Sequence, residues 1–249
     1  MKAFTGTGDL TVEDIVCEPF ISVASHLSQA ERAVVLARSS GENIDLIRAL
    51  IRLARLRYRL GRYDAAQSLA DEALSLTDAH ASERADIWQV LANCAADAGF
   101  LSQAEAYYRI AADLARETGY IRAQVAALHG LAAGAYYPRG CFDLALAADA
   151  EVRRIAVEQG RSEWLIYPLI TTALIYQLTG QRQLAHSTLD ELATLAPLGR
   201  WRKDVTSVSA QNLLWMKPRW KQPITCSSRL AQLPKPAANL GSTPLCACQ

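Results

Sequence analysis

The sequence lacks the motifs that identify common classes of enzyme. It has no Gly-x-x-x-x-Gly-Lys phosphate loop, no His-Glu-x-x-His metal motif and no Gly-x-Ser-x-Gly nucleophile elbow. Its four histidines are scattered over the sequence: His26, His80, His129 and His186. The acidic pair Asp71-Glu72 is adjacent in sequence, so its two carboxylates do not face each other on a helix. We therefore expect a protein that is not an enzyme and carries no cofactor.

Long apolar runs, a leader and a disulfide framework are also missing. No apolar run approaches the roughly 18–20 residues that a membrane span needs, and MKAFTGTGDLTVEDIV lacks the apolar centre of a signal peptide. The six cysteines show no disulfide spacing, so we expect free thiols in the cytoplasm. Cys246-Ala-Cys248 has no histidine nearby, so no metal site is expected. The net charge of +1 favours neither a bulk polyanion nor a membrane surface.

What the sequence does contain is an internal repeat. Gly61 opens the stretch GRYDAAQSLADEALSL, and degraded copies of it open at Gly99, Gly140 and Gly180, which are spaced 38, 41 and 40 residues apart. A further copy, SHLSQAERAVVLAR from Ser25, lacks the glycine. Alanine and leucine dominate the composition, which favours helix. A fixed period of this size is typical of stacked helical repeats.

Each copy predicts two helices joined at its glycine. Glycine suits the left-handed conformation that ends one helix and begins a tight turn. Asp64, Ser102 and Asp143 are predicted to cap the second helix. Each second helix also has an alanine at the same place, where a small residue lets two helix backbones approach closely. These alanines are Ala66, Ala104, Ala145 and Ala185.

The pattern resembles the tetratricopeptide repeat (TPR), a helix pair with Trp and Leu in its first helix, then Gly-x-Tyr, Ala, Tyr, Ala and Pro. The second complete copy matches it best, with Trp88, Leu91, Ala92, Gly99, Ala104, Tyr108 and Ala111. In the third copy, His129 stands where the tryptophan is expected. The long period is similar to that of repeats in the sensor arms of large transcriptional and signalling regulators. The resemblance implies an all-α, antiparallel helix-pair solenoid that forms a TPR-like superhelix.

Three regions are expected from end to end. Residues 1–24 are an irregular N-terminal segment or a worn first helix, and residues 25–198 form the repeat array. Residues 199–249 form a basic tail that contains proline and tryptophan and reads as disordered or loosely docked. A shifted reading frame would also produce this abrupt loss of the period. Within the array, Pro168 should kink or delay the first helix of the fourth repeat.

One basic stripe stands out as a candidate binding site. Four arginines recur at steps of four, three and four residues and share one helix face: Arg48, Arg52, Arg55 and Arg59. In the TPR family the first helices line a concave groove whose outward positions hold the ligand. The resemblance therefore places Arg48, Arg55 and Arg59 in that groove, beside Gln89 and Asn93 of the next repeat.

Two interpretations of this stripe are open. Arginine forks suit carboxylates, so an acidic peptide or the carboxy terminus of a protein is the natural ligand. Alternatively, the stripe is a solvated basic face that pairs with Asp86 or Asp97 across the groove, and such exposed pairs contribute only about 0–1 kcal/mol each.

Further along the array the corresponding face becomes apolar. Its residues are Tyr137, Tyr167, Ile170, Leu174 and Leu178. Either this face is a docking site, or the tail or further repeats cover it. Covering is favoured, because terminal repeats normally need a polar cap.

The leading interpretation is a protein- or peptide-binding scaffold, as a regulatory or sensor fragment of a signalling or transcription system, with no membrane partner. A nucleic-acid-associated regulator that uses the basic tail is less favoured, because that segment offers no folded platform. A helical-array enzyme is the third alternative. The absence of clustered acid, base or metal ligands argues against it, and His129 is better explained as a packed core histidine. The sequence specifies no oligomeric state.

Overall fold

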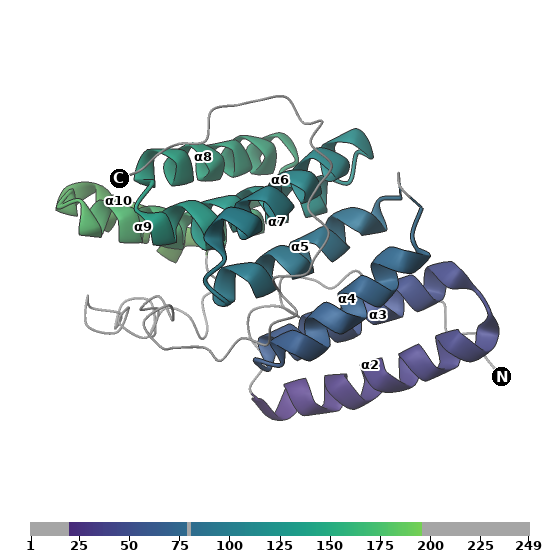
Figure 1. Ribbon diagram of the computed structural model, residues 1–249. Coiled ribbons are helices and arrows are strands. Elements are labelled where there is room, and N and C mark those ends of the chain that lie inside the picture. The colour runs from purple at the N-terminus through teal and green to yellow at the C-terminus, as the bar shows by residue number, and fades with distance from the viewer. Residues whose placement is uncertain (1–19, 79–80, 196–249) are drawn as a thin grey trace.

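The predicted repeat is present as a series of antiparallel helix pairs (Figure 1). The computed structural model describes residues 20–78 and 81–195, and these form nine α-helices and no strand. The all-α helix-pair architecture predicted from the sequence is therefore confirmed. The expectations for residues 1–19 and for the tail after residue 198 lie outside the described residues.

The helices follow one another in pairs along the array. α2 (Phe20–Ser40) precedes the first complete pair, α3 (Asn43–Arg59) with α4 (Tyr63–Leu76). The next pairs are α5 (Glu83–Asp97) with α6 (Leu101–Glu117), α7 (Ile121–Gly130) with α8 (Phe142–Glu158), and α9 (Ile166–Leu178) with α10 (Arg182–Leu195). We call α3, α5, α7 and α9 the first helices, and α4, α6, α8 and α10 the second helices.

The turns within the pairs are built as the glycines predict. Gly61 and Gly99 have φ angles of 71° and 85°, in the left-handed region that a side chain rarely adopts. The backbone N–H of Phe100 then donates to the carbonyl of Ala95 at 2.9 Å, which closes the end of α5. The backbone thus reverses within a few residues and returns antiparallel.

The predicted helix caps are wrong. The observed N-cap residues stand two positions before the predicted ones, and their side chains make no capping hydrogen bond. These residues are Arg62, Phe100 and Cys141. Asp64, Ser102 and Asp143 lie inside the first turn instead. There the negative carboxylates of Asp64 and Asp143 still interact favourably with the positive N-terminal end of the helix dipole.

Two first helices are irregular. After Gly130, α7 continues as a π-helical turn, η1 (Leu131–Tyr136), and a 3₁₀ turn, η2 (Tyr137–Arg139). α9 is preceded by a 3₁₀ turn, η3 (Ser162–Leu165), so Pro168 lies in the first turn of α9. Proline is tolerated there because the first-turn N–H groups have no helical partner. The predicted delay of this helix is confirmed.

The alanine that recurs in each second helix is part of the buried core. Ala66, Ala104 and Ala145 are fully buried, and Ala185 retains 8% exposure. Larger side chains from the first helices, among them Leu50 and Leu91, are buried in the same continuous core. A small side chain at each crossing allows the paired helices to pack closely, as the sequence predicts.

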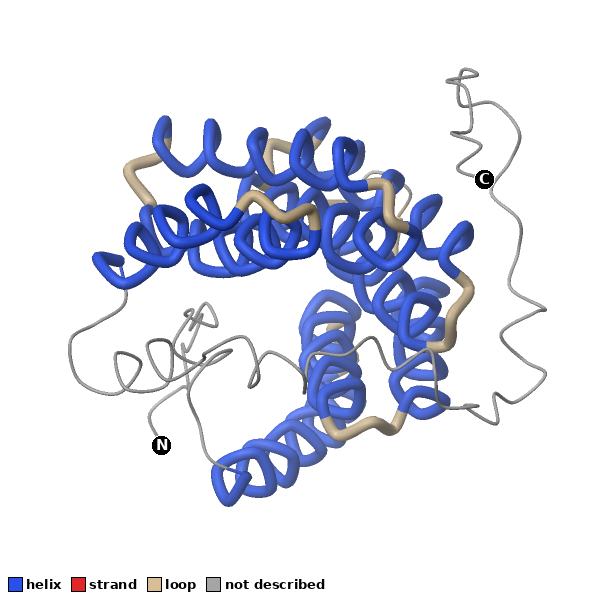
Figure 2. Tube along the Cα trace, turned by 90° about the vertical axis from the view of Figure 1, so that its left-hand side faces the viewer, coloured by secondary structure: helices blue, strands red, loops and turns tan. Residues whose placement is uncertain are grey.

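The array is curved (Figure 2). α3 contacts α5, α5 contacts α7, and η1 contacts α9. We place the first helices on the inside of the curve because consecutive first helices contact one another along the array. Ion pairs join neighbouring repeats on the other layer: Arg38 pairs with Glu72 between α2 and α4, and Arg153 pairs with Glu191 between α8 and α10.

Candidate functional site

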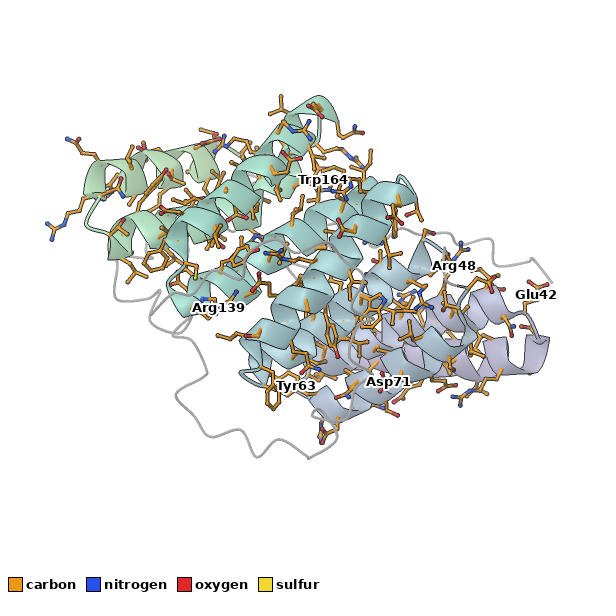
Figure 3. All side chains as sticks on the ribbon, turned by 45° about the horizontal axis from the view of Figure 1, so that its top comes forward. Glu42, Arg48, Tyr63, Asp71, Arg139 and Trp164 are labelled. Carbon is orange, nitrogen blue, oxygen red and sulfur yellow. The ribbon has the colours of Figure 1, made fainter. Side chains whose placement is uncertain are left out.

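The basic stripe lies on the inner layer and meets carboxylates of the next repeat. Nε and one terminal nitrogen of Arg48 lie 3.1 and 3.0 Å from Glu83 Oε1. A terminal nitrogen of Arg55 lies 2.5 Å from Asp86 Oδ1. Figure 3 shows Arg48 well apart from Arg139, which belongs to the third repeat. Part of the charge of the stripe is therefore used to hold α3 against α5.

Asp86 is the centre of a polar network that joins three successive repeats. It is only 6% exposed, and its Oδ1 accepts from Arg55 of α3. Its Oδ2 accepts from the hydroxyl of Tyr120 at 3.1 Å and lies 3.5 Å from Arg122, at the start of α7. Arg122 also bonds the Tyr120 hydroxyl. One carboxylate thus fixes the spacing of α3, α5 and α7.

The remaining residues predicted for the groove differ in how accessible they are. The Arg48 side chain is 59% exposed, and Arg59 is also exposed. Gln89 is half-buried. Asn93 is half-buried, and its Oδ1 accepts a hydrogen bond of 2.5 Å from the hydroxyl of Tyr108 on α6. Asn93 therefore helps to hold α5 against α6, and Arg48 and Arg59 offer the most accessible cations of the stripe.

The apolar face contains packed and exposed members. The ring of Tyr137 lies 6.1 Å from that of Phe142, and the ring of Tyr167 lies 5.9 Å from His129. Ile170 and Leu174 are half-buried. Tyr167 and Leu178 retain 37% and 62% exposure. Within this face, the two exposed side chains both belong to α9.

His129 is packed and hydrogen-bonded, as the sequence predicts. Its Nδ1 lies 3.0 Å from Asp149 Oδ1, and Asp149 on α8 is only 3% exposed. Burial raises the pKa of Asp149, because desolvation disfavours its ionised form, and the hydrogen bond from His129 opposes that rise. Asp149 was not predicted as a candidate residue. It stands nine residues after Gly140, and the equivalent residue of the second repeat, nine residues after Gly99, is Tyr108. A carboxylate where the repeat pattern has a packed tyrosine could have identified Asp149 from the sequence.

A second buried carboxylate, Glu105, was also not predicted. Its Oε1 accepts from Arg109 at 2.7 Å, and its Oε2 accepts from Arg139 of the third repeat. Arg109 also bonds the Tyr136 hydroxyl at 3.1 Å. This cluster ties α6 to the end of the first helix of the third repeat, so it is another inter-repeat contact.

The described residues hold neither a metal-binding cluster nor a membrane-spanning helix. No group of three or more histidine, cysteine, aspartate or glutamate side chains within residues 20–78 and 81–195 is placed to hold a metal ion. Over the same ranges, no helix has the length and hydropathy required to cross a bilayer.

Comparison with known proteins identifies the fold. No protein-family model matches the sequence, and no curated protein matches it either. The crystal structure of BtubC (BKLC) from P. vanneervenii superimposes with a TM-score of 0.61, covering 90% of this protein and 98% of that one. The fold is a TPR-like helical repeat. Because the two sequences are only 16% identical, the likeness establishes architecture alone.

Proposed function

We propose that this protein is a protein- or peptide-binding scaffold that holds its ligand along the inner layer of the array and acts in regulation, without catalysis. The observation that supports the proposal is the line of first helices, which presents exposed arginines at one end and exposed apolar side chains at the other. Arg48 and Arg59 belong to the basic end, and Tyr167 and Leu178 to the apolar end.

The charge of the basic end favours an acidic ligand. Glu83 and Asp86 pair with Arg48 and Arg55, but the guanidinium groups of Arg48 and Arg59 remain exposed to solvent. A carboxylate on a partner would form charge-assisted hydrogen bonds with the exposed guanidinium groups. Losing one such contact should cost about 1.5–3 kcal/mol, which is roughly a ten- to hundredfold loss of affinity.

The apolar end favours a partner that also carries large hydrophobic side chains. Leu178 is 62% exposed at the end of α9, and Tyr167 lies on the same helix. A partner segment that places an acidic stretch on α3 and an apolar side chain on α9 would use both ends. An extended polypeptide spans about 3.3–3.6 Å per residue, so a short unstructured segment can bridge such a surface.

Site-specific photocross-linking tests this placement. A photoreactive amino acid replaces Arg52, on the stripe, in one version of the protein and Arg116, on the second helix α6, in another. Arg116 is the matched control because its side chain is 67% exposed and pairs with Asp113 on its own helix. In extracts of the source cells we expect a partner captured at position 52 only. Equal capture at both positions would remove the inner layer as the binding surface.

A further inference from the structure

A hollow lies between α8, α9 and α10. It has a volume of about 410 Å³ and is bounded by α8, by α9 and by Thr188 of α10. Its polar lining comes from Asp149, Arg153, Thr172, Tyr176 and Thr188. Small-molecule sites in proteins typically measure about 300–1,000 Å³, so the hollow has room for a small ligand.

The hollow exists because the fourth repeat lacks the aromatic pair that fills the second. Trp88 and Tyr107 pack against each other there as a tilted pair, with ring centroids 5.0 Å apart. They stand eleven residues before and eight residues after the turn glycine Gly99. At the same distances from Gly180, the fourth repeat has Leu169 and Thr188, and both line the hollow. The smaller side chains leave unfilled the volume that two rings occupy elsewhere.

Asp149 lines this hollow, and its carboxylate is incompletely hydrogen-bonded. Its Oδ1 is bonded to His129, but its Oδ2 is buried and has no hydrogen-bond partner. A buried carboxylate oxygen without a donor is costly, and more so when the group is ionised. Arg153 also lines the hollow but does not bond this oxygen; its two terminal nitrogens bond Glu191 at 2.5 and 2.9 Å.

We propose that this hollow binds a small molecule carrying a primary ammonium group, with the ammonium donating to Asp149 Oδ2. An ammonium group has three donors, so the hydroxyl oxygens of Thr172 and Tyr176 can accept the other two. A guanidinium group that binds bidentately fits less well, because it would use both carboxylate oxygens and Oδ1 is already bonded to His129. Leu165 and Leu169 offer apolar contacts to a short alkyl group.

Thermal unfolding of the full-length protein tests the site, with n-butylammonium as the probe and n-butanol as its neutral analogue. At a probe concentration about ten times its Kd, the melting temperature should rise by about 3–6 °C. n-Butanol should produce no comparable rise, because it cannot neutralise Asp149.

Three variants locate the effect. Asp149→Asn keeps the shape of the side chain but removes its charge, and should abolish the response to n-butylammonium. Thr172→Leu narrows the hollow without touching the carboxylate, and should weaken the response at least tenfold in apparent Kd. Asp190→Asn, at an exposed carboxylate on α10, should respond as wild type does. Equal shifts with amine and alcohol, no shift with the amine, or an undiminished response in Thr172→Leu would each overturn the proposal, even if Asp149→Asn does not fold.

Discussion

Gly130→Ala is expected to destabilise the protein, against the usual effect of this substitution in a helix. Alanine normally stabilises a helix interior by about 0.5–1 kcal/mol relative to glycine. Here, a Cβ at Gly130 would lie 2.2 Å from Cε1 and 2.5 Å from Cδ1 of Tyr108. The ring cannot easily move, because Tyr108 is 2% exposed and its hydroxyl donates to Asn93 at 2.5 Å.

The magnitude follows from the overlap. Non-bonded carbon atoms prefer separations of about 3.5–4.0 Å, so the new methyl group would overlap the ring by more than about 1 Å. Overpacking of a well-filled core costs about 1–3 kcal/mol, which exceeds the gain in helix propensity. We expect a net loss of about 2 kcal/mol, or a fall in melting temperature of roughly 4–8 °C. Denaturant unfolding and calorimetry of the full-length protein would measure both.

A substitution at a second glycine, Gly134, distinguishes a clash with the hydroxyl of Tyr108 from a clash with its ring. A Cβ at Gly134 would lie 2.7 Å from the Tyr108 hydroxyl oxygen and 3.0 Å from Cε2. Tyr108→Phe removes that oxygen, so it should partly rescue Gly134→Ala but not Gly130→Ala, after allowing about 1 kcal/mol for the lost hydrogen bond to Asn93. A melting temperature for Gly130→Ala equal to or above that of wild type would refute the close approach of α6 and α7.

Three further expectations follow from the buried polar groups. Asp86→Ala removes the shared acceptor of Arg55 and Arg122 and should lower the free energy of unfolding by about 2–4 kcal/mol. The control Arg116→Ala should change it by no more than about 0.5 kcal/mol. Equal effects of the two substitutions would contradict the structural role of Asp86. Burial, helped by nearby Asp97, raises the pKa of Cys94 to about 12, so iodoacetamide at pH 8 should modify Cys94 only after denaturation, as mass spectrometry would show. Burial also raises the pKa of Asp149, so the folded state binds its proton more readily than the unfolded state, and ionising Asp149 lowers stability as the pH rises between the two pKa values. Denaturant unfolding from pH 4 to pH 8 should therefore show Asp149→Asn gaining stability relative to wild type, and a constant difference would argue against that burial.

The helix pairs were predictable because the signals for them are local. A glycine that must adopt a left-handed conformation and a fixed alanine at each helix crossing are properties of short stretches of sequence. α4, α6, α8 and α10 accordingly each begin within two residues of a repeat glycine. The caps failed because the preference of Asp64 and Ser102 for a cap competes with a turn that the glycine already closes through backbone hydrogen bonds.

The inter-repeat contacts were largely unpredictable because they depend on how neighbouring helices are rotated and shifted. Arg55 with Asp86 was one of the two alternatives that the sequence left open, whereas Arg48 with Glu83 spans 35 residues and was not foreseen. Helical spacing places four arginines on one stripe, but it does not show which carboxylates of the next repeat they meet. The site assigned to that stripe stays a prediction until a ligand is found.

The most direct test of the central claim is calorimetric titration of the partner captured at position 52 into three forms of the full-length protein: wild type, Arg59→Ala and Arg116→Ala. Arg59 belongs to the stripe on the inner layer and is exposed, whereas Arg116 lies on the second helix α6. If the inner layer binds an acidic segment, Arg59→Ala should weaken binding roughly ten- to hundredfold, and Arg116→Ala should bind as wild type does. Equal affinities for all three forms would contradict the claim that the basic stripe holds the ligand.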